Sequence, residues 1–104
     1  MIKVSVLYPN KPGAKFDMDY YCNSHMPLVS SKLGAALKGM EVHQGLAAGT
    51  PDSPPAYVAM GHLSFESVAA FQQAFEPNAG AILGDIPNYT DIEPIIQISE
   101  VKMD

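Results

Sequence analysis

The segment FDMDYYCNSHMPL, residues 16–28, says most about both the fold and the chemistry of this chain. Asp17 is a suitable helix N-cap because its carboxylate can accept hydrogen bonds from free backbone N–H groups. Phe16 and Tyr21 occupy the two positions of a hydrophobic staple. Tyr21 and His25 are four residues apart, so a helix places both side chains on one face. Because imidazole titrates near neutral pH, His25 is the best candidate for acid–base chemistry, with the Tyr21 phenol beside it.

Pro27 interrupts this helical segment. Proline has no backbone N–H, and its ring clashes with the preceding turn, so a regular helix cannot run through it. We predict a break near His25 and Met26, with Pro27 opening a second helical piece. Gly34 or Gly39 is expected to end that piece.

The rest of the chain is typical of four strands and a second helix. Runs of alternating or β-branched residues between turns predict strands at 2–8, 40–47, 57–65 and 95–101. An apolar stripe predicts a helix from about Ser67, and Pro77 restarts it as a short helix through Leu83. The order β-α-β-β-α-β predicts a single ferredoxin-like α+β domain over residues 1–104, with helices on one face of an antiparallel four-stranded sheet.

Such a sheet has a second face that the helices leave open. In strand 57–65, one face carries small and apolar side chains that suit packing under helices: Ala59, Gly61, Leu63 and Phe65. His62 and Met60 then belong to the open face. In the last strand, alternate residues form two sets: Ile96 with Ile98, and Ile95 with Gln97 and Ser99. The sequence does not decide which of these sets lies on the open face.

The composition predicts that this open face is covered by a second copy. Apolar residues make up 47% of the chain and charged residues only 16%, against a usual value of about 25% charged. A domain of this size hides only about two-thirds of its surface on folding. We therefore expect a homodimer.

Charge and hydropathy argue against several classes of partner. The net charge is −5, and the six Lys and Arg residues form no basic stripe, so we expect neither nucleic acid nor an anionic membrane as a partner. No apolar run reaches the roughly 18 residues of a membrane span, and the N-terminal residues lack the features of a signal peptide. A single cysteine, Cys22, fits a reducing compartment. These features predict a cytoplasmic protein.

Three segments resemble the EthD family in sequence and in order. They are FDMDYYCNSHMPL (16–28), YVAMGHLSFES (57–67) and IPNYTDIEPIIQISEV (86–101), and the resemblance covers nearly the whole chain. The family belongs to the dimeric α+β barrel superfamily, in which two ferredoxin-like sheets pack face to face and a ligand cavity lies between sheet and helices. The resemblance therefore implies a homodimer and a cavity near His25. It also implies a role in a degradation pathway, because the family is linked to breakdown of ethyl tert-butyl ether beside a cytochrome P450 system.

We expect the site to be a pocket of about a few hundred Å³ that faces His25 and Tyr21. His25 is either the acid–base group of this pocket or a structural residue that caps freed carbonyls around Pro27. His62 either lines the cavity opposite His25 or is satisfied at the dimer interface. We expect Tyr8, Tyr89, His62 and Met60 to contribute to ligand binding.

Other candidate groups are weaker. Cys22 is expected to be a buried structural thiol. The three histidines, His43 included, have no short metal-ligand spacing, so we expect no metal site. No G-x-G-x-x-G motif follows a strand, and we expect no cofactor.

Three functions compete. The first is an enzyme that performs cofactor-independent isomerisation, cyclisation or oxidation on a small, largely apolar molecule, with His25 as acid–base group. The second is a non-catalytic binding protein, or an accessory protein for a partner oxygenase. The third is a haem protein with His25 as axial ligand.

Overall fold

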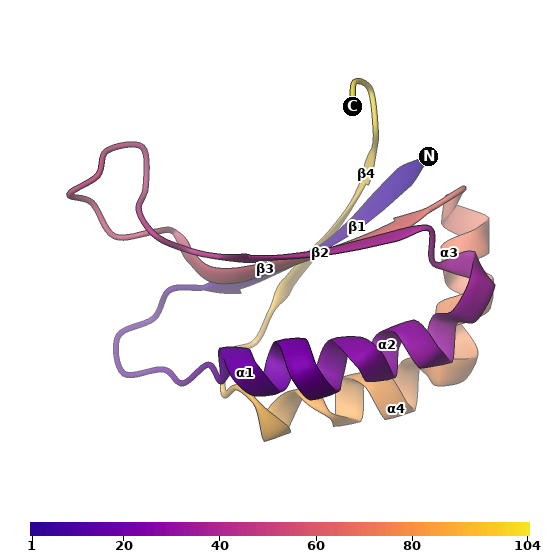
Figure 1. Cartoon of the computed structure of the whole chain (residues 1–104), viewed down its shortest axis with the longest axis horizontal. Helices are drawn as coiled ribbons and strands as arrows, with labels where there is room; N and C mark the ends of the chain where they lie inside the picture. The colour runs from indigo at the N-terminus through magenta and orange to yellow at the C-terminus, as the bar shows by residue number, and fades with distance from the viewer.

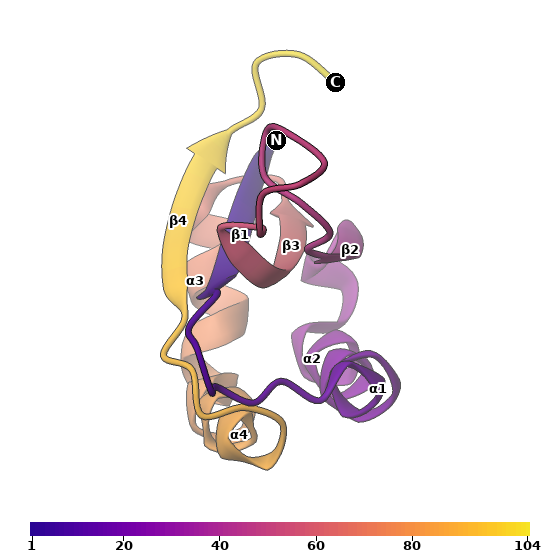
Figure 2. The same cartoon turned by 90° about the vertical axis from the view of Figure 1, so that its left-hand side faces the viewer.

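A four-stranded antiparallel sheet with helices on one face forms the protein, as a computed structural model of residues 1–104 shows (Figures 1 and 2). The strands are β1 (Ile2–Pro9), β2 (Gly39–Gln44), β3 (Tyr57–Phe65) and β4 (Ile95–Glu100). Their order across the sheet is β2-β3-β1-β4, and every neighbouring pair is antiparallel. This is the predicted ferredoxin-like α+β fold. The main difference is in β2, which ends three residues earlier than the sequence indicated.

Two helical segments cover the same face of the sheet. The first comprises α1 (Met18–Tyr20), a π-helical turn η1 (Tyr21–His25), α2 (Met26–Leu33) and a 3₁₀ turn η2 (Gly34–Ala36). The second comprises α3 (Val68–Phe75), the 3₁₀ turn η3 (Glu76–Asn78), α4 (Ala79–Gly84) and the 3₁₀ turn η4 (Ile86–Asn88). None of these helices has the length and apolar character needed to cross a membrane.

The irregularity predicted around Pro27 is present, but it widens the helix and does not break it. The N–H of Met26 donates to the carbonyl of Tyr21, five residues back, which defines the π-helical turn. Tyr21, His25 and Met26 all keep right-handed helical backbone angles, so the helix continues. Pro27 lies in the first turn of α2, where a missing N–H costs little. Gly34 ends α2 at a positive φ of 60°, as predicted.

Side-chain caps predicted from the sequence also form. The Asp17 carboxylate accepts from the backbone N–H of Tyr20 at 3.0 Å. The ring of Phe16 contacts that of Tyr21 edge-on, with 5.1 Å between the centroids. These local contacts fix where the first helical segment begins, and therefore where the side chain of His25 lies relative to the sheet.

Burial of alternate residues in β3 confirms the predicted assignment of its two faces. Ala59, Gly61, Leu63 and Phe65 are buried under the helices. In β4, Ile98 pairs with Val4 and Ile96 pairs with Val6, so these two isoleucines share the helix-covered face. Ile95 and Gln97 therefore belong to the open face. Because β4 is an edge strand, Ile96 and Ile98 remain 53% and 42% exposed even on the covered side.

Candidate functional site

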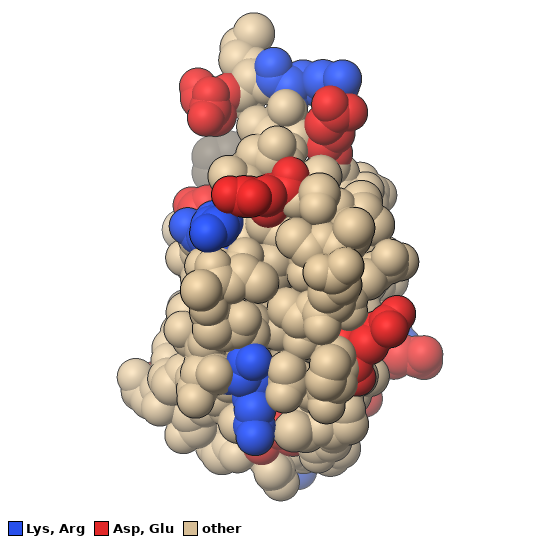
Figure 3. Space-filling model, turned by 90° about the vertical axis from the view of Figure 1, so that its right-hand side faces the viewer, with Lys and Arg blue, Asp and Glu red and all other residues tan.

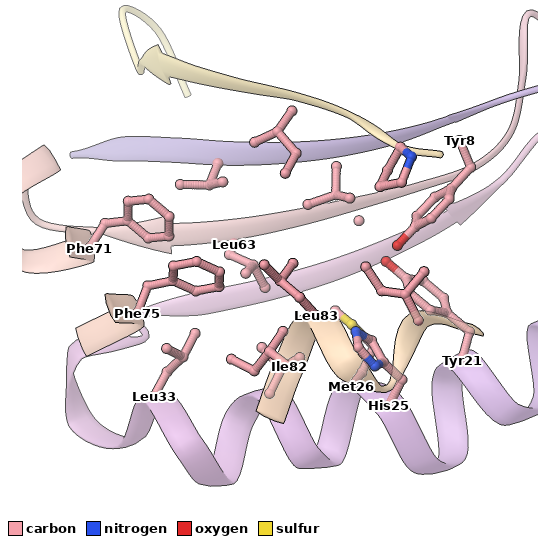
Figure 4. Close-up of a pocket in the computed structure, with 17 residues that line it drawn as sticks. Tyr8, Tyr21, His25, Met26, Leu33, Leu63, Phe71, Phe75, Ile82 and Leu83 are labelled. Carbon is pink, nitrogen blue, oxygen red and sulfur yellow. The ribbon is translucent and has the colours of Figure 1, made fainter. Parts of the chain in front are cut away.

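An apolar cavity lies between the sheet and the helices (Figure 4). Its volume is about 90 Å³, and 14 of its 17 lining residues are hydrophobic. No Lys, Arg, Asp or Glu lines it. The cavity is smaller than the few hundred Å³ that we expected. The rings of Phe71 and Phe75 from α3 lie at one end of it (Figure 4).

His25 lines this cavity and is paired with a carboxylate from the second helical segment. Its Nδ1 is 2.9 Å from Oδ2 of Asp85. The side chains are only 6% and 13% exposed, so little water competes for the bond. Asp85 follows the end of α4 and lies 60 residues from His25 in the sequence.

Asp85 is held in place by two further donors. The Tyr20 hydroxyl donates to Oδ1 at 2.7 Å, and the Asn88 amide donates to the same oxygen at 2.9 Å. Partial burial opposes ionisation of Asp85, but the hydrogen bonds from Asn88, Tyr20 and His25 outweigh it and lower the pKa of this carboxyl. Asp85 is therefore a carboxylate at neutral pH.

This pairing determines the tautomer of the His25 imidazole. A carboxylate can only accept, so Nδ1 of His25 must carry the proton in the bond to Asp85. In the neutral ring, Nε2 is then an acceptor with a free lone pair. The structure gives Nε2 of His25 no hydrogen-bond partner. Since no fully buried side-chain nitrogen or oxygen lacks such a partner, Nε2 is not fully buried and keeps some accessible surface. The ring can therefore accept a proton or a hydrogen bond at the cavity wall.

A cluster of buried tyrosines surrounds this imidazole. The Tyr21 ring stacks on that of His25 at a centroid distance of 5.6 Å and an interplanar angle of 14°, which confirms that the two residues share a helix face. The Tyr89 ring packs against His25 at 4.6 Å, and the Tyr89 and Tyr8 hydroxyls are 2.7 Å apart. Burial raises the pKa of Tyr8, Tyr21 and Tyr89 well above the usual value. These phenols therefore stay neutral and keep their protons.

Gly61 in β3 makes room for the Tyr21 side chain. A Cβ atom at this position would collide with the Tyr21 hydroxyl oxygen. The absence of a side chain thus lets the phenol reach across the strand toward the phenol of Tyr8, as Figure 4 shows.

Two of the predicted ligand-binding residues lie on the opposite side of the sheet. His62 and Met60 alternate with the buried residues of β3, so they point to the open face. The prediction that His62 lines the cavity opposite His25 is therefore wrong, and the same holds for Met60. Instead, Nδ1 of His62 lies 2.8 Å from the hydroxyl oxygen of Ser5. The His62 ring also packs against the ring of His43, with 4.9 Å between the two centroids.

Of the remaining candidates, Tyr8 lines the cavity directly. Tyr89 does not line it but contacts two residues that do, Tyr8 through the hydroxyls and His25 through the rings. Cys22 is exposed on the outer side of the π-helical turn, so its prediction as a buried thiol is wrong. Sequence reasoning missed Asp85. Its only signal was its position one residue before the segment 86–101 that resembles the EthD family.

The residues present do not form a site for a metal or for haem. No group of three His, Cys, Asp or Glu side chains is placed to hold a metal ion. A cavity of about 90 Å³ is also too small for a porphyrin beside His25. The haem interpretation therefore does not fit this site.

Comparison with known protein families shows which family this chain belongs to. A family model described as the EthD domain matches residues 14–93. The chain belongs to the EthD family. The resemblance found in the sequence is thereby confirmed, and the match includes both His25 and Asp85.

Solved structures support this assignment. An EthD-like protein from Ralstonia eutropha JMP134 is 48% identical to this EthD protein, with a TM-score of 0.95 over 99% of this chain and 93% of that one. An EthD family protein from Bacillus halodurans C-125 is 23% identical, with a TM-score of 0.74 over 97% of this chain and 98% of that one. HapK from Hahella chejuensis is 9% identical, with a TM-score of 0.60 over 100% and 96%. The last two show similarity of fold alone. No curated protein matches the chain.

Proposed function

We propose that this EthD protein binds a small, neutral, largely apolar molecule in the cavity and that His25 acts on it as a general base. The observation that carries the proposal is the His25–Asp85 pair at the wall of an apolar cavity. The bond to Asp85 holds the proton on Nδ1 and leaves Nε2 free to take a proton from the ligand. The carboxylate also stabilises the imidazolium that forms.

The neutral phenols suit a reaction in which a carbonyl oxygen becomes negative. When Nε2 of His25 removes a proton from the carbon next to a carbonyl, the electron pair of the C–H bond forms an enolate. Hydrogen bonds from Tyr8 or Tyr21 would stabilise the enolate oxygen, because their hydroxyls lie at the same end of the cavity as His25 (Figure 4). If the proton on Nε2 first exchanges with solvent, transfer of a solvent deuteron from Nε2 to the same carbon completes hydrogen–deuterium exchange. Return of the proton to another carbon of an unsaturated ketone completes an isomerisation. Such a step needs no cofactor and fits a role in a degradation pathway.

The test is deuterium exchange at the carbons beside the carbonyl of 2-butanone, a ketone small enough for a cavity of about 90 Å³, in D₂O, followed by NMR. We expect the wild-type protein to accelerate exchange and His25→Gln to reduce it to the background rate. His43→Gln is the matched control for the loss of an imidazole, because His43 lies on the open face of the sheet and does not line the cavity. Its exchange rate should equal that of the wild type when sedimentation shows the same oligomeric state for both. Exchange that persists in His25→Gln would refute the catalytic role. Binding of 2-butanone without any exchange would favour the alternative of a binding or accessory protein.

We also propose that two copies pair through the open sheet face. Apolar side chains on this face include Leu7, Val58, Met60 and Ile95, and Ile95 is 50% exposed. The net charge of −5 argues against nucleic acid as the partner. Figure 3, which views the molecule from the right-hand side of Figure 1, shows acidic and basic side chains interspersed on that side.

Sedimentation at micromolar concentration tests the pairing. We expect a dimer for the wild type and a monomer for Met60→Asp, because the new charge would be buried at the interface. Leu46→Asp, in a loop position that is 88% exposed, should remain dimeric. A cooperatively folded wild-type monomer would rule the dimer out.

A further inference from the structure

Four ionisable side chains form a cluster on the open face of the sheet, away from the cavity. They are Lys3 of β1, Glu41 and His43 of β2, and His62 of β3. Nζ of Lys3 lies 3.3 Å from Oε2 of Glu41, and Nε2 of His43 lies 3.5 Å from the other oxygen of the same carboxylate. The His43 and His62 rings pack together with 4.9 Å between their centroids. The proposed chemistry of the cavity uses none of these groups.

The cluster lies among the apolar residues through which we expect two copies to pair. Met60 of β3 is opposite Leu7 on β1 and opposite His43 on β2. His62 is the next residue of β3 on the same face, and β3 is an inner strand of the sheet. A second copy that covers Met60 and Leu7 therefore also covers both imidazoles.

The net charge of this face depends on the protonation of the two imidazoles. Lys3 and Glu41 are the only charged residues that the four strands place on the open face, and their charges balance while both histidines are neutral. The hydrogen bond from Lys3 lowers the pKa of Glu41, so this group stays a carboxylate in mildly acidic solution. Once His43 and His62 are protonated, a single carboxylate faces three cations. Two paired copies would then bury four additional positive charges, which is unfavourable without further anions to pair with them.

We infer that the pairing of two copies through the open face is controlled by pH, with His43 and His62 as the sensor. The dimer forms while both imidazoles are neutral and dissociates when they become protonated. This inference rests on the proposed pairing of two copies, and it adds the regulation of that interface.

The direction of the effect follows from proton linkage. Because the dimer disfavours the imidazolium forms, it binds fewer protons than two separate copies do, so its dissociation constant rises as the pH falls. Burial, together with the nearby charges of His43 and Lys3, lowers the pKa of His62 within a single copy. Protonation of His62 therefore begins to weaken the dimer below about pH 6.5, the ordinary value for an imidazole.

Sedimentation of the wild-type protein at pH 7.5, 6.5, 5.5 and 5.0 and constant ionic strength tests the inference. Circular dichroism at each pH confirms that the chain is folded. Each imidazole that must lose its proton on pairing contributes up to about tenfold per pH unit. We therefore expect the dissociation constant of the dimer to rise by about tenfold or more between pH 7.5 and 5.0. A constant that changes by less than about twofold would overturn the inference.

Histidine variants show whether this pair is the cause. The double variant His43→Gln/His62→Gln carries neutral side chains at every pH, so its dissociation constant should vary by less than about threefold over the same range. His25→Gln is the matched control, because it removes the remaining imidazole from the other side of the sheet and should keep the wild-type pH dependence. A wild-type pH dependence in the double variant, or its loss in the control, would overturn the inference.

A second measurement needs no variant. The coupling between protonation and pairing is reciprocal, so pairing must also shift the titration of His62. NMR signals of the His62 ring are followed against pH at protein concentrations below and above the dissociation constant of the dimer. The midpoint should lie at lower pH in the concentrated sample, and equal midpoints would contradict the inference.

Failure of this inference is distinguishable from failure of the proposed pairing. A wild-type protein that is dimeric at pH 7.5 and has a pH-independent dissociation constant overturns only the control by pH. A wild-type protein that is monomeric at pH 7.5 overturns both proposals.

Discussion

Asp85→Asn keeps the size of the side chain but removes the charge that orients His25. The carboxylate accepts three hydrogen bonds, from His25, Tyr20 and Asn88. An amide can keep the two bonds to its remaining oxygen, but it presents an NH₂ group to His25. The imidazole must then turn Nδ1 into an acceptor and move its proton to Nε2. The base at the cavity wall thereby becomes a donor.

The cost to stability follows from the change of charged bonds into neutral ones. A hydrogen bond to a charged group contributes about 1.5–3 kcal/mol, and a neutral bond about 0.5–1.5 kcal/mol. We expect Asp85→Asn to lower the free energy of unfolding by about 1–3 kcal/mol at pH 7. Deuterium exchange should fall by about two to four orders of magnitude, the range seen when a base carries its proton on the wrong nitrogen.

The pH dependence of the free energy of unfolding tests whether the negative charge of Asp85 causes this loss of stability. The pKa of Asp85 is lowered in the folded protein, so its stabilising contribution is fully present above the ordinary carboxyl pKa near 4 and is lost as the pH falls through the lowered value. Urea unfolding of wild type and Asp85→Asn should therefore differ most at pH 7 and converge below about pH 4. Long-range ¹H–¹⁵N spectra at pH 7.5 report the tautomer of His25. A stability difference that does not change with pH, or an Nδ1–H tautomer in the variant, would refute the argument.

Three further changes test the surroundings of the site. Gly61→Ala should lower the free energy of unfolding by about 1–3 kcal/mol, because the added methyl collides with the Tyr21 hydroxyl. Gly80→Ala is the control and should not lower it, because the space around a Cβ at this helical position is open. Tyr8→Phe should cost about 1–2 kcal/mol in thermal or urea unfolding, since it leaves a buried phenol without its partner; a change below about 0.3 kcal/mol would contradict this. Burial lowers the pKa of His62, so wild-type stability should decrease as the pH falls from 7 to 5, and His62→Gln should show a flatter profile; identical profiles would exclude His62 as the cause.

Much of the fold was predictable because its signals are local. Asp17, Pro27 and Gly34 act on backbone groups within a few residues, so their effects on the first helical segment follow from chemistry and spacing alone. Proline also illustrates the limit of such reasoning. The missing N–H implied an irregular helix, but only the structure shows that the chain absorbs it as a π-helical turn.

The site was only half predictable, for a related reason. Tyr21 and His25 were found because a helix brings residues four apart together. Alternation along β3 placed His62 on the open face, but it did not show that the cavity lies wholly on the other side. No period relates Asp85 to His25, which lie 60 residues apart.

The sequence by itself determined the order of strands and helices, the two faces of β3, the shared face of Tyr21 and His25, and the EthD resemblance. Each depends on neighbours in the chain or on a repeating pattern. Only the tertiary structure decided which face of β4 meets the helices, how small the cavity is, and that Asp85 orients His25. These features arise where separate segments pack together, and the distance between such segments is set by the sum of all side-chain contacts between them.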